Sequence, residues 1–128
     1  MAALGRRIWA MHGERTVTPF DEERTQAILN EVLDERREQH EKWGQQDHAD
    51  GEWAIILGEE VGEVMAEVVE ISFHGKRAGN LVRELRQVVA VAVAWMEAID
   101  RRSEATNRNL LDEVEAVYGV PSKEDEIE

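Results

Sequence analysis

The chain of 128 residues is long enough for one hydrophobic core, and its hydrophobic fraction of 42% excludes a wholly disordered protein. A formal net charge of -13 argues against general binding to nucleic acid or anionic membranes, because both require basic patches. The absence of cysteine excludes disulfides and thiolate metal sites, and no apolar run approaches the roughly 20 residues of a membrane span, so a cytoplasmic location is expected.

The chain is predicted to hold one helical domain between two less regular ends. Residues 1–17 show no clear periodicity and are expected to form an irregular N-terminal arm that lacks the apolar core of a signal peptide. The domain spans 18–119, and residues 120–128 are expected to be an acidic, disordered tail.

The first predicted helix starts with Thr18 as N-cap and Pro19 at the first helical position, and it ends at Gly44. Its inner stripe changes from apolar to polar partway along, which is typical of a helix that reaches solvent or enters a pocket. The stripe consists of Ile28, Leu29, Val32, Leu33, Arg36, Gln39, His40 and Trp43.

A turn-rich loop over 44–51 precedes the second predicted helix, 52–74, with Asp50 as its cap. One face of this helix is apolar, and the reverse face is also too apolar for solvent, which indicates burial on both sides. The first face holds Trp53, Leu57, Val61, Val64, Val68 and Ile71, and the reverse face holds Gly58, Gly62, Met65 and Val69.

The third predicted helix, 81–101, begins after Asn80 and contains a run that is apolar on every side, Val88 to Met96. The valines of this run make a short buried strand the competing interpretation, but the helical spacing of the flanking residues favours a helix. A fourth helix, 104–118, is predicted to turn Leu110, Leu111, Val114 and Val117 inward. The sequence thus predicts an all-α four-helix bundle. Because the amphipathic helices cover only part of the apolar surface, a homodimer or homotetramer is expected.

Carboxylates lie where two of these helices would bury apolar side chains. On a helical wheel Glu60 falls within about 20° of Trp53, and Glu84 lies similarly close to Val91 on its own helix. Glu60, Glu63 and Glu84, if pointed at one another, would repel strongly unless a cation neutralised them. Mg²⁺ favours such oxygen ligands, so the sequence predicts a metal site inside the bundle.

Other side chains near these acids suit a nucleotide, although each also has an ordinary structural interpretation. Trp43 and Trp53 flank the loop and could stack on a base, together with His40. Lys76 and Arg83, with Arg77 and Arg86, form the basic cluster beside the acids, which suits a polyphosphate. His48 and Glu97 are expected to be exposed to solvent.

The stretch from Glu31 to Arg101 resembles the all-α NTP pyrophosphohydrolases, in particular the MazG-like branch found in phages and bacteria. The segments that carry the resemblance are ERREQHEKWGQQDH at 35–48, LGEEVGEV at 57–64 and NLVRELRQVVAVAVAWMEAI at 80–99. The family pattern is Glu-x-x-Glu, a spacer and Glu-x-x-Asp. Glu60 and Glu63 match the first half and Glu84 starts the second, but Gln87 stands where the family has aspartate.

The resemblance implies hydrolysis of an NTP or dNTP between the α- and β-phosphates, with Mg²⁺ or alternatively Mn²⁺, in a dimer or tetramer. An amide at Gln87 can ligate a metal but brings no charge, so either metal affinity falls or Glu67 substitutes. The alternative is a catalytically weak or inactive helical module that binds nucleotides or protein partners. A remoter alternative, an acidic mimic of DNA, rests on the net charge alone.

Overall fold

The computed structural model describes residues 5–8 and 18–119, and these residues form an all-α fold without β-strands. The all-α prediction is confirmed. Three long helices dominate the fold, while residues 5–8 form one short helical turn. The rest of the predicted N-terminal arm and the predicted acidic tail, 120–128, lie outside the described residues. No described helix combines the length and apolar character that a membrane crossing requires.

Helix α2, Glu22–Trp43, starts three residues later than the sequence predicted. The N-cap is Asp21 rather than Thr18, and its carboxylate accepts a 2.9 Å hydrogen bond from the backbone N–H of Arg24. A carboxylate is favoured at this position because it also meets the positive end of the helix dipole. The helix ends at Gly44 as predicted, where a φ of 69° suits glycine.

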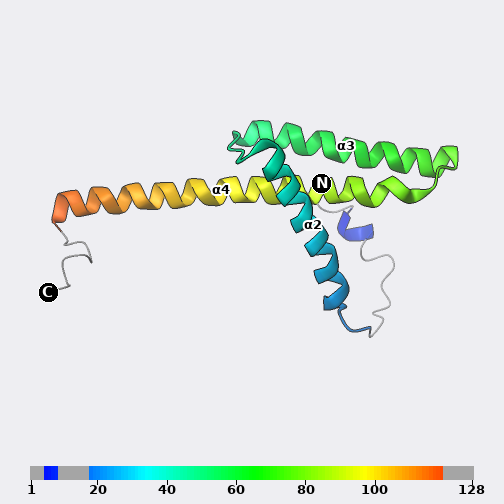
Figure 1. The fold of residues 1–128 in the computed structure, drawn as a ribbon, viewed down its shortest axis with the longest axis horizontal. Coiled ribbons are helices and arrows are strands. Elements are labelled where there is room, and N and C mark those ends of the chain that lie inside the picture. Colours follow the sequence, from blue (N-terminus) through cyan, green and yellow to red (C-terminus); the bar gives the residue numbers. More distant parts are fainter. Residues whose placement is uncertain (1–4, 9–17, 120–128) are drawn as a thin grey trace.

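Helix α3, Asp50–His74, and helix α4, Leu81–Tyr118, form an antiparallel hairpin joined by a 3₁₀ turn over Ala78–Asn80 (Figure 1). Asp50 is not the cap of α3, because Ala49 holds that position without a side-chain cap. The carboxylate of Asp50 instead accepts hydrogen bonds from Trp95 Nε1, at 2.8 Å, and from Arg102, at 2.7 Å. These bonds fasten the start of α3 to α4.

The predicted break between a third and a fourth helix does not exist, because α4 runs through residues 101–104 without interruption. No glycine or proline lies in that stretch. The hydroxyls of Ser103 and Thr106 bond back to the carbonyls of Ile99 and Arg102, at 3.2 and 3.0 Å, so they do not compete with the helix. The described residues therefore form three long helices and one short one, and the third and fourth helices of the predicted bundle are a single helix.

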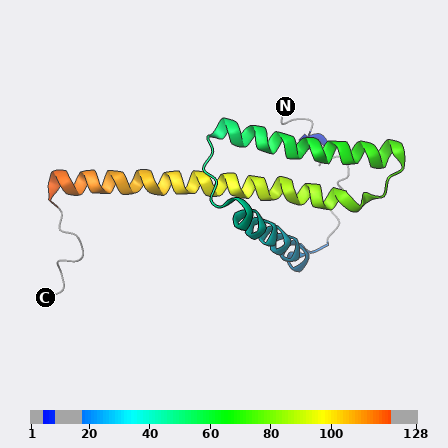
Figure 2. The ribbon, with the colours of Figure 1, turned by 45° about the horizontal axis from the view of Figure 1, so that its top comes forward.

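The core is small and lies where the N-terminal part of α3 packs against the middle of α4. Trp53 packs there with Val91, Ala94 and Ala98, and Ile56, Leu57 and Trp95 surround this cluster. Helix α2 packs on α4 at an angle, and among the described residues it does not pack on α3 (Figures 1 and 2). Of its predicted inner apolar stripe only Val32 is buried, while Ile28, Leu29 and Leu33 are exposed.

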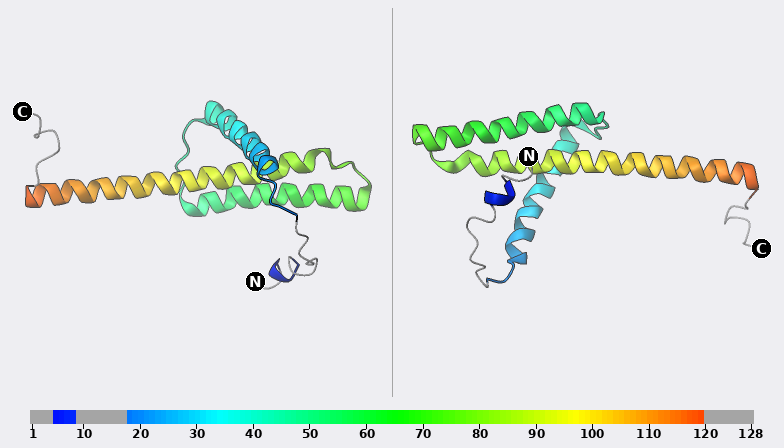
Figure 3. Two further views of the ribbon diagram at one scale, coloured as in Figure 1. Left: turned by 90° about the horizontal axis from the view of Figure 1, so that it is seen from below. Right: turned by 180° about the vertical axis from the view of Figure 1, so that it is seen from behind.

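Half of α4 lies beyond the hairpin, as the views in Figures 1 and 3 agree. The side chains predicted to face inward there, Leu110, Leu111, Val114 and Val117, are all exposed, so that prediction is wrong for a single chain. The physical reason is the continuity of α4: without a turn near residue 102, this segment cannot fold back onto the other helices.

Candidate functional site

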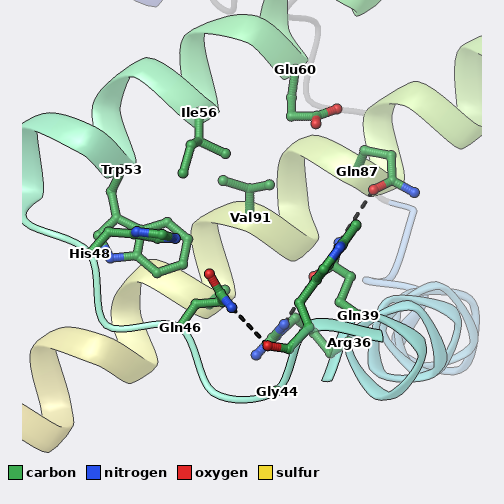
Figure 4. A pocket seen from close by; sticks show the side chains of 12 residues that line it. Arg36, Gln39, Gly44, Gln46, His48, Trp53, Ile56, Glu60, Gln87 and Val91 are labelled. Carbon is green, nitrogen blue, oxygen red and sulfur yellow. Dashed lines mark hydrogen bonds between the residues drawn. The ribbon is translucent and has the colours of Figure 1, made fainter. Parts of the chain in front are cut away.

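A pocket of about 200 Å³ opens between the C-terminal end of α2, the loop after it and the α3–α4 hairpin (Figure 4). Aromatic and apolar side chains form part of its wall, and amides, one guanidinium and one carboxylate form the rest. Its main side chains come from Arg36, Gln39, Trp43, Gln46, His48, Trp53, Ile56, Glu60, Gln87 and Val91.

The two tryptophans that the sequence singled out both line this pocket, in different settings. Trp53 is 4% exposed, and its ring meets the ring of His48 edge to face with centroids 4.8 Å apart. Trp43 is 57% exposed, and Lys42 Nζ lies 4.6 Å from its ring centroid. Trp53 is therefore part of the core, whereas Trp43 is an exposed ring at the rim of the pocket.

The loop that carries His48 is fastened to α4 by Arg101. This guanidinium donates hydrogen bonds to the carboxylate of Asp47, at 2.8 and 3.0 Å, and to the carbonyl of Gln46, at 3.1 Å. The side chain of Gln45 and then Arg101 lower the pKa of Asp47 by donating hydrogen bonds to its charged form. The pocket wall formed by this loop is thus held by α4.

Polar side chains link α2 to α4 at the pocket, and Figure 4 shows three of them, Arg36, Gln39 and Gln87. Arg36 pairs with Glu97 at 2.6 Å and donates a 2.9 Å bond to the side-chain oxygen of Gln39. The amide of Gln39 then donates to the side-chain oxygen of Gln87, at 3.3 Å. The oxygen with which Gln87 would ligate a metal is therefore already engaged. Glu97, expected to be solvated, keeps 41% of its side chain exposed and also forms this ion pair.

Glutamates from all three long helices surround Glu60. Burial raises the pKa of Glu60, and the nearby carboxylates of Glu84 and Glu63 raise it further. Glu59 on α3 and Glu35 on α2 act in the same direction. Of the three predicted metal-binding acids, Glu60 alone lines the pocket, and the charges of the other two act on it.

The carboxylate groups suit a divalent cation as ligands, but their side chains are not positioned to coordinate one. Carboxylates that repel one another are suited to a hard cation. Yet within residues 5–8 and 18–119 no group of three or more acidic or histidine side chains is close enough to hold a metal ion. Glu67, the possible substitute ligand, pairs with Lys76 Nζ at 2.8 Å through one oxygen, and its other oxygen is buried without a hydrogen-bond partner. Metal binding would therefore require carboxylate side chains to rotate.

Three residues of the basic cluster predicted to hold phosphates form ion pairs with acids. Lys76 pairs with Glu67, and Arg83 pairs with Glu84 at 3.3 Å. Arg86 pairs with Glu31 on α2. Arg83 remains 62% exposed, and a single hydrogen bond joins it to Glu84, so a phosphate group can compete for it more easily than for the others.

The structure does not bring His40 to the pocket. This residue is exposed and lines a separate shallow hollow with Arg36 and Glu97, where α2 meets α4. His48, expected to be exposed in its loop, is half-buried and lines the pocket instead. The sequence could have indicated His48 as a pocket residue, because its loop lies between two tryptophans. Arg36 and Gln39 were identified only as the polar continuation of a helix stripe, not as pocket residues.

No protein-family model, curated protein or solved structure was found to match this chain. A functional proposal therefore rests on the residues of this pocket and on the resemblance carried by the Glu-x-x-Glu pattern.

Proposed function

We propose that this protein is a Mg²⁺-dependent nucleoside triphosphate pyrophosphohydrolase, which cleaves an NTP or dNTP to a monophosphate and pyrophosphate. The observation that carries the proposal is that Glu60 lines a pocket with two tryptophans in its wall, while carboxylates from all three long helices are near enough to raise its pKa. A charged cluster at the edge of a partly aromatic pocket suits a ligand with a flat base and a metal-bound polyphosphate. The proposal includes a cytoplasmic location, where such substrates occur.

Glu60, Glu63 and Glu84 would hold Mg²⁺, or Mn²⁺ in its place, with Gln87 or Glu67 as a further oxygen donor. The bound ion would neutralise phosphate charge and activate water. Trp43 and Trp53 would line the base site, with His48 rather than His40 as the neighbouring imidazole. Arg83 would exchange its ion pair with Glu84 for one with a phosphate oxygen. Lys76 would either keep its ion pair with Glu67 or bind the terminal phosphate.

The test is a panel of NTPs and dNTPs incubated with the protein and Mg²⁺, with the products separated and identified. We expect monophosphate and pyrophosphate in equal amounts. Glu60→Gln should lower the rate at least about 100-fold, because it removes a charge that the metal site needs. Glu113→Gln, at an exposed position far along α4, is the matched control and should leave the rate unchanged. Release of diphosphate and orthophosphate instead would refute the reaction type.

A specific observation favours a second candidate, a nucleotide-binding or interaction module without catalysis. The side-chain oxygen of Gln87 is engaged by Gln39, and the acids are not gathered into a ligand set. Gln87→Asp separates the two candidates, since it restores the missing charge. If the natural protein binds nucleotide without turnover and this substitution creates activity, the protein is a non-catalytic nucleotide-binding module. If the natural protein is already active, the hydrolase is correct.

A further inference from the structure

The loop between α2 and α3 supplies an uncharged hydrogen-bond acceptor to the pocket, the side-chain oxygen of Gln46. The last carbonyl groups of a helix have no partner within that helix. At the end of α2 the side-chain amide of Gln46 donates a 2.9 Å hydrogen bond to one of them, the carbonyl of Trp43. A carbonyl oxygen can only accept, so the nitrogen of this amide must face Trp43. In Figure 4 the amide oxygen is turned away from that carbonyl, to the side of Trp53 and Val91.

The orientation of this amide is fixed, and its oxygen is available to a ligand. Reversal would set the Gln46 oxygen against the carbonyl oxygen of Trp43 and would lose the hydrogen bond. The backbone of Gln46 is held as well, because Arg101 donates a 3.1 Å hydrogen bond to its carbonyl. Within residues 5–8 and 18–119 no group donates to the side-chain oxygen, and this oxygen keeps some exposure to solvent. Gln46 therefore presents a preorganised acceptor to whatever enters the pocket.

Gln46 lies at the end of the pocket that is remote from Glu60. Two residues further along the loop, His48 contacts the ring of Trp53. Trp53 and Glu60 stand about two turns apart on α3, which is about 10 Å along the helix axis. In the proposed function the phosphates and the metal ion lie toward Glu60, so the base lies toward Trp53 and Gln46. The lone pairs of the Gln46 oxygen would repel phosphate oxygens but accept a hydrogen bond from an N–H group of a base.

We propose that Gln46 selects nucleotides whose base carries an amino group, cytosine or adenine, over those with a carbonyl at the same position. The proposal rests on the proposed function for the placement of the base. The Gln46 oxygen accepts a hydrogen bond from the 4-amino group of cytosine or the 6-amino group of adenine. Uracil and hypoxanthine carry an oxygen there, which faces the Gln46 oxygen and leaves both acceptors unpaired. Because Trp43 holds the amide nitrogen, the site cannot adapt by turning the amide around.

Binding of nucleoside monophosphates without metal tests this selection independently of hydrolysis. The pairs dCMP with dUMP and AMP with IMP keep sugar and phosphate constant within each pair, while the amino group becomes a carbonyl. The shifts of the tryptophan indole N–H signals in NMR spectra of the full chain give each Kd. We expect the amino nucleotide to bind about five- to tenfold more tightly than its carbonyl partner, which is the effect of one hydrogen bond in a site open to solvent.

Gln46→Ala should abolish the preference within each pair, mainly by weakening the amino nucleotides. Gln45→Ala is the matched control, because this neighbouring amide bonds to Asp47 at 2.6 Å, does not line the pocket and should leave the preference unchanged. The same spectra verify that both variants remain folded. An equal loss of affinity for dCMP and dUMP in Gln46→Ala would overturn the proposal, because the oxygen would then meet the sugar.

The outcomes for base selection and for the enzyme activity are separate. If the natural protein binds both members of each pair equally, or binds none of the four nucleotides, the selection by Gln46 is overturned even where hydrolysis of triphosphates is observed. If the amino nucleotides are preferred and Gln46→Ala removes the preference, the selection stands even where no pyrophosphate is released, and only the proposed reaction fails.

Discussion

At Glu60 the chain places a carboxyl group where both burial and neighbouring carboxylates disfavour its charge. Its pKa is raised above the ordinary value, so the folded protein binds this proton more tightly than the unfolded chain does. Ionisation of Glu60 therefore costs stability as the pH rises through its folded-state pKa. Below the ordinary glutamate pKa of about 4.3, both states are protonated and the cost disappears. Structural residues seldom carry such a cost, which is a reason to connect Glu60 with function.

Glu60→Gln should raise the melting temperature at pH 7 by about 1–3 °C, since solvent screens much of the repulsion. The difference should vanish near pH 4. Addition of Mg²⁺ should raise the melting temperature of the natural protein by more than that of the variant, because the ion loses a ligand. Differential scanning calorimetry measures both effects. An equal response of the two proteins to Mg²⁺ would exclude Glu60 as a metal ligand.

The two tryptophans of the pocket should differ sharply in their contribution to stability. Trp53→Ala removes a 4% exposed side chain from the core and should lower the free energy of unfolding by about 3–5 kcal/mol. Trp43→Ala removes a side chain that is 57% exposed and should cost less than about 1 kcal/mol. Urea unfolding followed by circular dichroism gives both values. Similar losses for the two variants would contradict the assignment of Trp53 to the core and Trp43 to the rim.

Among the elements, α4 departs most from what its sequence predicted. A change from an apolar to a charged composition near residue 101 resembles a helix end, but a helix ends only where a breaker or a cap competes with the next backbone hydrogen bond. Ser103 and Thr106 satisfy their hydroxyls within the helix, so nothing there competes. The continuity of α4 gives the molecule its long, unsupported segment.

Glu104→Pro distinguishes one helix from two. Within a continuous helix, proline removes a backbone hydrogen bond and clashes with the preceding turn, at a cost of about 3 kcal/mol. At the first turn of a separate helix it would be tolerated. We therefore expect lower helical content by circular dichroism and a lower melting temperature, with Glu104→Ala as the control for loss of the side chain. A proline variant as stable as the alanine variant would restore the two-helix interpretation.

The whole molecule carries a net charge of -13, and its acids crowd the pocket edge as well as the surface. Moderate salt should therefore stabilise it. Raising the ionic strength from about 0.01 to 0.15 M shortens the screening length from about 30 to 8 Å. The melting temperature should rise by a few degrees, and Mg²⁺ at the same ionic strength should add a further increase if it binds the carboxylates. A fall in melting temperature with salt would show that attractive ion pairs dominate instead.

Some features of this protein follow from local sequence. Periodicity alone predicted helices over 52–74 and from residue 81 onward, and Gly44 predicted the end of α2, because local backbone and capping preferences determine them. The grouping of Glu60 with Glu84 was likewise foreseen, since both lie on the faces that two neighbouring helices turn toward each other.

Other features depended on contacts between distant residues. Asp50 was expected to cap α3 but bonds to Trp95 and Arg102 across the hairpin. The pocket includes His48 rather than His40, because Arg101 fastens the loop to α4, while His40 lies in a separate hollow with Glu97. The sequence by itself determined that the chain is helical, where α2 ends and α4 begins, and the charge of the site. Only the tertiary structure decided which side chains meet, because the angle between helices and the path of a loop depend on packing that no local pattern encodes.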